Sequence, residues 1–202
     1  MKKILLYLLL AIVLFLAYIL FNTLTFTSSQ MKVDAIATVP TPEGAVDRMI
    51  KAISIRTASF ESESDFDSIQ FRLFNQFLEE SYPLVHDQLE HREFNKFSHL
   101  FKWTGSNPSL KPIVLMGHHD VVPIASLRKW TVHPFTEGIK NDTIFGRGSI
   151  DDKGAVIGLL EATEQLLKEG KVPQRTVYLS FGHDEEIGGE RGAVAIAKYL
   201  EV

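Results

Sequence analysis

The chain has 202 residues, of which 21 are basic, 25 are acidic and none is cysteine. Disulfides and thiolate metal sites are therefore excluded, although many exported proteins also lack cysteine, so the compartment stays open. The first 30 residues hold two lysines and no acid, which leaves 19 basic and 25 acidic residues, a net charge of −6, in the remainder. An acidic remainder without a basic block argues against a nucleic-acid partner.

The N-terminus begins with Lys2 and Lys3, followed by an unbroken apolar run over residues 4–21. Eighteen apolar residues reach the lower range for a membrane-spanning helix. A cleaved signal peptide has a shorter apolar core and a small-residue cleavage site, and residues 22–30 offer no clear Ala-x-Ala pattern. We therefore predict that residues 1–26 form a signal anchor. The alternative is secretion after cleavage of a signal peptide. The two lysines predict a cytoplasmic N-terminus and an extracytoplasmic remainder.

After a linker over residues 27–42, which ends in a stiff Thr-Val-Pro-Thr-Pro spacer, apolar spacing predicts helices over residues 45–53 and 65–80. The apolar side of the second helix is expected to hold Phe66, Ile69, Leu73, Phe74, Phe77 and Leu78. Alternation over residues 97–103 predicts a half-buried strand, and the turn at 105–108 is expected to close a hairpin with a buried strand over 113–116.

The second half of the chain predicts alternating helices and strands. A tight turn over residues 146–154 enters a helix that Gly170 and Pro173 end, a buried strand follows over 176–181, and a last helix runs to about Leu200. This order implies parallel strands joined by crossover helices. We therefore expect an α/β fold, a three-layer αβα arrangement with a mostly parallel or mixed sheet, over residues 43–202.

The strand over residues 113–116 stops at a glycine and delivers His118 and Asp120. Because these residues are two apart, their side chains point to the same side of an extended backbone. A histidine followed in this way by a carboxylate suits a metal ligand, since the imidazole binds the ion through one nitrogen and the carboxylate orients the ring through the other.

Two further acidic pairs, Asp151-Asp152 and Glu185-Glu186, stand at a helix entrance and just beyond a strand. The carboxyl ends of strands form the usual site in open α/β sheets. Imidazole and carboxylate ligands suit zinc or a similar divalent ion. One carboxylate could bridge two ions about 3.5–4 Å apart. Another carboxylate could deprotonate a metal-held water. These residues also have non-functional interpretations. Asp151 could serve only as the N-cap of its helix, and Glu185 and Glu186 could belong to a solvated loop. Asp152 and Lys153 are expected at the surface.

Together these motifs resemble a known family. The segments GHHDVVP (117–123), GRGSIDDKG (146–154) and EEIGG (185–189), with Trp130 and residues 133–135 between them, are similar to the dinuclear-zinc aminoacylases, carboxypeptidase S, succinyl-diaminopimelate desuccinylase and glutamate carboxypeptidase. The carboxypeptidase S-like branch is the most similar, and the resemblance covers about residues 45–202.

The resemblance implies a role for five positions. His118 would bind one zinc ion and Asp120 would hold that histidine, Asp151 would bridge the two ions, Glu186 would bind the second ion, and Glu185 would be the general base. The implied reaction is cleavage of a peptide or N-acyl-amino-acid amide bond by a water that two Zn²⁺ ions activate.

The family pattern also includes one more acidic ligand, a late histidine and a lid domain, none of which has a counterpart in this sequence. The resemblance therefore implies that residues 43–202 are the N-terminal part of a zinc peptidase domain, with a possible homodimer through the absent lid. The alternative is a non-catalytic, membrane-tethered half-domain that lacks the remaining metal ligands.

Overall fold

A computed structural model describes residues 2–31, 33–35, 37–135 and 138–201. The chain divides into two compact units, Met1–Pro40 and Thr41–Val202.

The first unit contains one helix, α1 (Lys2–Thr25), with no buried residue. At about 1.5 Å per residue it is about 36 Å long, which exceeds the roughly 30 Å hydrocarbon core of a bilayer. Among the described residues it is the one helix with the length and composition to cross a membrane. Signal sequences share these properties, so the choice between an anchor and a cleaved signal stays a prediction.

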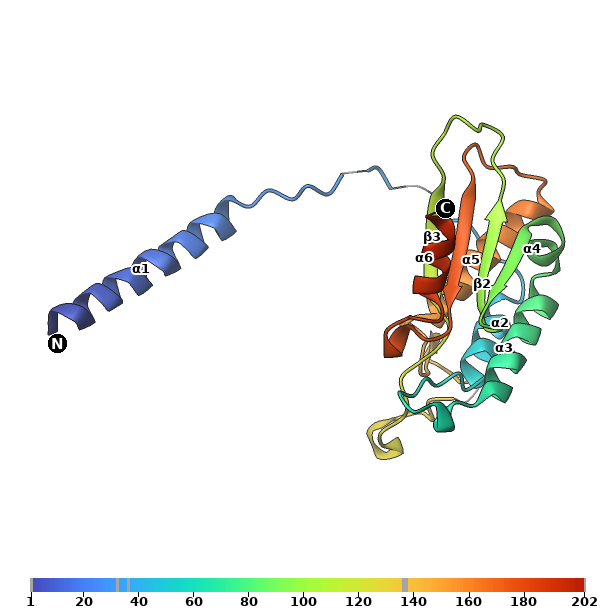
Figure 1. Cartoon of the computed structure of the whole chain (residues 1–202), viewed down its shortest axis with the longest axis horizontal. Helices are drawn as coiled ribbons and strands as arrows, with labels where there is room; N and C mark the ends of the chain where they lie inside the picture. Colours follow the sequence, from blue (N-terminus) through green and yellow to red (C-terminus); the bar gives the residue numbers. More distant parts are fainter. Residues whose placement is uncertain (1, 32, 36, 136–137, 202) are drawn as a thin grey trace. The chain divides into compact units, whose positions relative to one another are not determined.

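The second unit is built on a four-stranded sheet in the order β1-β2-β6-β3 (Figure 1). Strand β2 (Ser98–Trp103) pairs antiparallel with both β1 (Glu90–Phe94) and β6 (Val177–Gly182), whereas β3 (Ile113–His118) runs parallel to β6. Helix α5 (Lys153–Lys168) connects the two parallel strands. The mixed sheet and its crossover helix confirm the α/β prediction.

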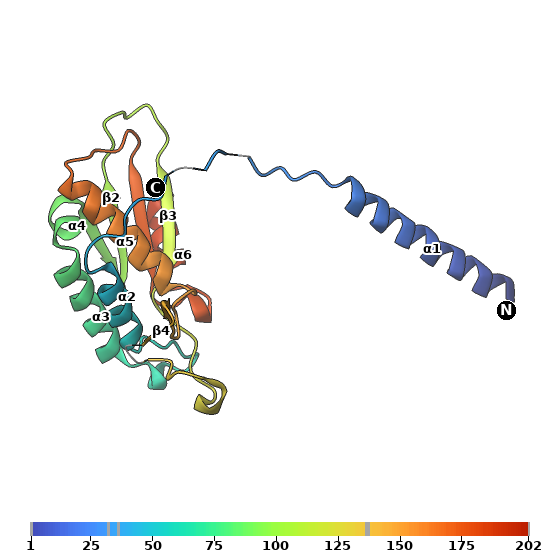
Figure 2. The ribbon, with the colours of Figure 1, turned by 180° about the vertical axis from the view of Figure 1, so that it is seen from behind.

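Helices cover both faces of this sheet. Figures 1 and 2 show α2 (Ala45–Ser54), α3 (Ser68–Ser81), α4 (Pro83–Gln88) and α5 on one face and α6 (Ala193–Leu200) on the other. The predicted three-layer αβα arrangement is therefore confirmed. The short elements are the 3-10 turns Glu63–Asp65, Leu127–Lys129 and Glu185–Ile187 and the two-residue strands β4 (Ile139–Lys140) and β5 (Thr143–Ile144).

Helix α3 begins at Ser68, three residues later than predicted, because Asp67 caps it. The Asp67 carboxylate accepts hydrogen bonds from the backbone N–H groups of Ile69 (3.1 Å) and Gln70 (3.4 Å), which satisfies donors that the helix itself leaves unpaired. Ile69 is 59% exposed, so it does not belong to the core as predicted. Leu73 is also exposed, whereas the buried residues of the helix are Phe71, Phe74, Phe77 and Leu78.

The predicted hairpin between residues 97–103 and 113–116 is wrong, because β6 lies between β2 and β3. The connecting segment bonds instead to the segment that precedes β6: the N–H of Ser106 donates to Pro173 (2.9 Å) and that of Asn107 to Gln174 (2.8 Å). The segment after β2 does turn, but the strand that pairs with β2 lies more than 70 residues further along the chain, since Trp103 pairs with Val177.

Strand β3 is less buried than its apolar sequence predicts. Its first four side chains are 37–62% exposed, Met116 most of all. Strand β6 covers one edge of β3, and no strand among the described residues pairs with the other edge. The composition is that of an interior strand, with apolar residues on both faces.

A partly buried ion pair, in which Glu161 is the buried partner, joins α2 to α5. Arg48 donates to Glu161 through Nε (2.5 Å) and Nη2 (2.7 Å), and the Tyr82 hydroxyl donates to the same carboxylate (2.9 Å). Bidentate geometry of this kind gives strong, charge-assisted hydrogen bonds. Removing one partner of such a pair leaves the other charge buried without compensation.

We therefore expect Arg48→Met to destabilise the protein by about 3 kcal/mol, since Glu161 keeps its burial and loses its cation. Urea unfolding measures this change. The double variant Arg48→Met/Glu161→Met should recover most of the loss, and Glu90→Gln, which breaks the exposed pair with Lys102, should have little effect. A single variant as stable as the wild type would contradict the prediction.

His99 gives the fold a predictable response to pH. Burial, together with the charges of neighbouring histidines, lowers its pKa to about 3, against about 6.5 in an unfolded chain. Between these values the unfolded chain binds more protons, so stability is complete above about pH 6.5 and falls by up to about 1.4 kcal/mol per unit as the pH falls toward 3. Urea unfolding at pH 6.5 and 4.5 should show a smaller loss for His99→Gln than for the wild type. Equal losses would contradict this account.

Candidate metal centre

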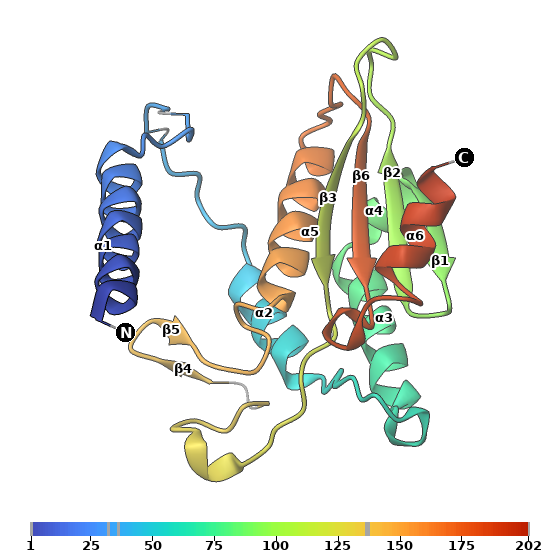
Figure 3. The ribbon, with the colours of Figure 1, turned by 60° about the vertical axis from the view of Figure 1, so that its left-hand side comes forward.

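Four chain segments meet at the carboxyl ends of β3 and β6 (Figure 3). Strand β3 ends at His118, the loop before α5 carries Asp151, and the turn after β6 carries Glu185 and Glu186. The segment between α2 and α3 joins them, since the N–H of Val121 donates to the Thr57 carbonyl at 2.9 Å. The strand-end arrangement therefore brings together residues that are far apart in the sequence.

Three predicted ligands converge. One ligand atom each from His118, Asp151 and Glu186 lies within 4.8 Å of the other two. Nε2 of His118 lies 3.0 Å from Oδ1 of Asp151 and 3.6 Å from Oε2 of Glu185. His118 is 8% exposed, whereas the Asp151 side chain is 76% exposed. The imidazole of His118 is thus buried, and the Asp151 carboxylate contacts it from the side that faces solvent.

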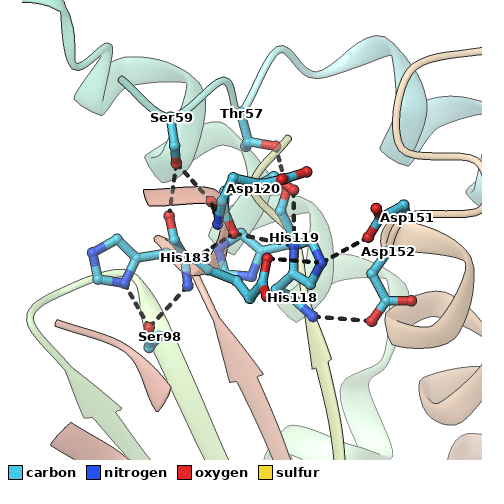
Figure 4. A network of polar contacts seen from close by, with 11 residues as sticks. Thr57, Ser59, Ser98, His118, His119, Asp120, Asp151, Asp152 and His183 are labelled. Atoms are coloured by element: carbon cyan, nitrogen blue, oxygen red, sulfur yellow. Dashed lines mark hydrogen bonds and ion pairs between the residues drawn. The ribbon is translucent and has the colours of Figure 1, made fainter. Parts of the chain in front are cut away.

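Asp120 is the organising residue of the site. Its carboxylate is fully buried and accepts a hydrogen bond from the Ser59 hydroxyl (2.8 Å; Figure 4). It also accepts from the backbone N–H groups of Glu185 and Glu186, both at 3.1 Å. Nδ1 of His118 lies 3.3 Å from an Asp120 carboxylate oxygen and 3.1 Å from the Asp120 carbonyl oxygen. One side chain therefore positions the histidine and the backbone of both glutamates.

Asp151 does not cap the helix that follows it. Helix α5 begins at Lys153, its N-cap residue is Asp152, and neither acid makes a capping hydrogen bond. Asp152 instead accepts a hydrogen bond from the backbone N–H of His118 at 3.3 Å (Figure 4). The peptide bond between the two aspartates is cis. The reading of Asp151 as a cap alone is therefore wrong, and its carboxylate faces His118.

Lys153 was expected at the surface, but it is fully buried. Its Nζ donates to the carbonyls of Ala52 (2.8 Å) and Ile55 (2.5 Å) and lies 5.0 Å above the Phe74 ring. Carbonyls at the end of a helix lack intrahelical donors, so the last turn of α2 offers partners for a buried amine. Burial lowers the Lys153 pKa to about 7, against the opposing charge of Asp120. Lys153 thus ties the entrance of α5 to α2.

Two serines that were not predicted, Ser59 and Ser98, hold the site in place through hydrogen bonds. The Ser59 hydroxyl lies 3.2 Å from the carbonyl oxygen of His183, in addition to its bond with Asp120. Ser98 accepts from the backbone N–H of His183 (3.1 Å) and contacts the Nδ1 of that ring at 2.5 Å (Figure 4). Nothing in the sequence marks either serine, because each lies more than 60 residues from its partners.

His119 follows the predicted ligand His118 in the chain, but its ring packs in the core. Its ring is fully buried and stacks on Phe74 with a centroid distance of 4.8 Å. Neither ring nitrogen has a hydrogen-bond partner among the described residues. Burial holds the His119 pKa well below its usual range, so the ring is neutral.

The electrostatics of the site favour a cation. Burial alone would lower the pKa of His118, but its hydrogen bond to Asp120 and the Asp120 charge, followed by Asp151, raise it to about 9. Burial and the charge of Asp151 raise the pKa of Glu186. Within the described residues, no lysine or arginine forms an ion pair with these carboxylates. An imidazole beside carboxylates that have no lysine or arginine partner suits a divalent ion. Such an ion would displace the proton between His118 Nε2 and Asp151.

Comparison with known proteins identifies the family. Residues 114–201 match the model described as peptidase family M20/M25/M40. Over 190 residues, 89% of its length, the chain is 43% identical to the probable carboxypeptidase S-like 2 of Dictyostelium discoideum, of which it covers 36%. The chain belongs to peptidase family M20. Within this M20 family it falls in the carboxypeptidase S-like branch, as the sequence predicted, and the family is metal-dependent.

Other relatives are named for different activities. The chain is 40% identical to the N-fatty-acyl-amino acid synthase/hydrolase PM20D1 of Xenopus tropicalis, with 77% of this chain and 30% of that protein aligned. Carboxypeptidase S of Saccharomyces cerevisiae is 36% identical over 77% of this chain and 29% of its own length. The chain thus spans about a third of the length of the curated relatives it matches.

Solved structures agree on the fold. Human carnosine dipeptidase 1 superposes with a TM-score of 0.61 at 17% identity, over 74% of this chain and 33% of that one. An M20 family metallo-carboxypeptidase from Sulfolobus solfataricus superposes with a TM-score of 0.58 at 21% identity, over 73% and 32%. These matches place the second unit in the M20 catalytic fold.

Proposed function

We propose that residues 43–202 supply metal ligands and the general base of a hydrolase that cleaves a peptide or N-acyl-amino-acid amide bond. The observation that carries the proposal is the convergence of His118, Asp151 and Glu186 at the ends of β3 and β6. Relatives named as carboxypeptidases and as an N-fatty-acyl-amino acid synthase/hydrolase support this substrate class.

In this proposal His118 and Asp151 would hold one zinc ion, and Asp151 and Glu186 would hold the second. Nitrogen and oxygen donors without sulfur suit zinc, and the Asp151 carboxylate, whose side chain is exposed, has two oxygens that could serve as ligands. When bound, such ions polarise the substrate carbonyl and make a water molecule more acidic. Asp120 fixes the ring of His118 so that Nε2 faces the ligand position.

Glu185 moves the proton. Its carboxylate is 56% exposed and lies 3.6 Å from His118 Nε2, at the edge of the ligand cluster. There it takes a proton from the attacking water, whose oxygen forms the new bond to the carbonyl carbon. As the carbon–nitrogen bond breaks, Glu185 passes that proton to the leaving amine. The backbone bond from Glu185 to Asp120 keeps the base beside the ligands.

Two assays test the proposal. Calorimetric titration of the chain with Zn²⁺ should show binding that Asp151→Asn weakens by more than about 100-fold, beyond the range typical of residues that only support a ligand. A chimera in which this chain replaces the matching third of the Dictyostelium relative should hydrolyse dipeptides or N-acyl amino acids. Absence of Zn²⁺ binding by the chain would refute the proposal. Binding without hydrolysis in the chimera would favour the non-catalytic alternative.

The proposal includes a membrane location. Helix α1 has the length and composition of a span, and the lysines before its apolar run favour a cytoplasmic N-terminus. The chain should therefore stay with membranes after carbonate extraction, and protease added outside should digest residues after α1. Release of a shortened soluble chain would instead indicate a cleaved signal. The homodimer stays a proposal that sedimentation can test.

A further inference from the structure

A second group of metal-type side chains lies away from the carboxylate centre. Strands β1 and β2 and the helices α3 and α4 line a pocket at the edge of the sheet. The pocket is lined by Asn75, Glu79, His86, His91, Glu93 and His99. The proposed hydrolysis uses none of these residues.

The hydrogen bonds of this pocket fix the tautomer of its central histidines. The side-chain N–H of Asn75 donates to the Lys96 carbonyl (2.9 Å), so the amide oxygen must accept from Nε2–H of His99 (3.0 Å). His99 therefore accepts at Nδ1, and the donor there is Nε2–H of His91 (3.0 Å). The chain of bonds leaves the lone pair on Nδ1 of His91 without a partner among the described residues.

His86 is oriented in the same way. Its Nδ1 lies 2.9 Å from the carbonyl oxygen of Tyr82, which can only accept, so Nδ1 carries the proton and Nε2 keeps its lone pair. Metal-binding histidines almost always donate their second ring N–H to a protein acceptor, because that bond sets the tautomer and the ring orientation. His86 and His91 each meet this condition.

The spacing of the two rings also suits one shared ion. Their centroids lie 5.5 Å apart with the planes at 80°. Two imidazoles bound to one tetrahedral ion, with nitrogen–metal distances of about 2.0–2.1 Å, have centroids about 5 Å apart. The carboxylates of Glu79 and Glu93 line the same pocket and are exposed, so they can rotate toward an ion.

We propose that this pocket binds a divalent transition-metal ion through Nε2 of His86 and Nδ1 of His91, with at least one of Glu79 and Glu93, together with water, completing the coordination. Imidazole with carboxylate donors suits Zn²⁺ or Cu²⁺. Because His86 belongs to α4 and His91 to β1, the ion fastens the helical layer to the edge strand of the sheet. The site is separate from the carboxylate centre and does not depend on it.

The test uses the full chain in detergent with the carboxylate centre disabled by His118→Ala, Asp151→Asn and Glu186→Gln. With Cu²⁺ as the probe, we expect one tightly bound ion whose electron paramagnetic resonance spectrum shows coupling to two imidazole nitrogens. His86→Gln and His91→Gln should each remove one nitrogen coupling and weaken binding at least about tenfold. Asp87→Asn, a change beside His86 that lies outside the pocket lining, is the matched control and should bind Cu²⁺ like the background chain.

Thermal unfolding gives a second readout that does not rely on copper. Zn²⁺ should raise the Tm of the background chain and of Asp87→Asn, but not that of either histidine variant. If His91→Gln fails to fold, Glu79→Gln and Glu93→Gln leave the histidine bonds intact and should still weaken Cu²⁺ binding when combined. Unchanged Cu²⁺ affinity in His86→Gln and His91→Gln, or no bound ion in the background chain, would overturn the proposal. Neither outcome bears on the hydrolase, because its ligands are absent from every sample.

Discussion

Replacing Glu185 by glutamine in the chimera with the Dictyostelium relative is expected to lower kcat about 10²–10⁴-fold, the usual contribution of a general base. Glutamine keeps the shape and the backbone N–H that binds Asp120, but it cannot take a proton. Zn²⁺ affinity should change by less than about threefold, because Glu185 is not among the three converging ligands. Steady-state kinetics and zinc titration of the same preparation measure both quantities.

The neighbouring residue provides the sharpest control. Glu186→Gln changes the same atoms one position further along the same turn, and it should weaken Zn²⁺ binding by more than about 100-fold. Excess Zn²⁺ should then restore part of the activity of Glu186→Gln and none of that of Glu185→Gln. If the two variants behave alike, or if Glu185→Gln turns over at the wild-type rate, the division of roles between the two glutamates is wrong.

Replacing Asp120 by asparagine should damage both the site and the fold. The Asp120 carboxylate accepts on both oxygens, from Ser59, Glu185 and Glu186, so an amide NH₂ in either orientation faces at least one donor. We expect a loss of about 2–3 kcal/mol in stability and about 10–100-fold in Zn²⁺ affinity, since His118 loses its orienting charge. Chemical unfolding and calorimetric titration test the two effects.

Glu190→Gln is the matched control for Asp120→Asn, because it also removes one negative charge from the loop region after β6 but lies on an exposed side chain. It should leave stability and Zn²⁺ affinity close to those of the wild type. Wild-type metal affinity in Asp120→Asn would contradict the positioning role of Asp120.

The sequence predicted where the site residues come together, because the topology of the sheet determines which strand ends lie side by side. His118 and Glu185 each follow an apolar strand, and parallel strands joined by a crossover helix end on the same edge of a sheet. Ser59 and Ser98 could not be found in this way. Each supports the site through a single hydroxyl on a segment that is distant in sequence and has no motif of its own.

The errors in the predicted fold have the same cause. Sequence patterns report local composition, but they do not show which segments pack beside one another in space. The run at residues 113–116 is apolar on both faces, yet β3 lies at the edge of the described sheet. Strand β1 was not predicted, because the first four residues of Glu90–Phe94 are charged or polar and the strand has no apolar face, as is typical of a solvent-exposed edge strand. Lys153 is buried because the end of α2 supplies carbonyl acceptors for its amine, and a helical pattern cannot show that.

The central claim is that His118, Asp151 and Glu186 share bound metal. Anomalous diffraction at the zinc edge from crystals of the zinc-loaded chain tests it most directly. We predict a peak within about 2.0–2.2 Å of Nε2 of His118 and of a carboxylate oxygen of Asp151, with Glu186 bound to the same or to a second ion about 3.5–4 Å away. Zinc-loaded crystals with no peak between these three side chains would contradict the account.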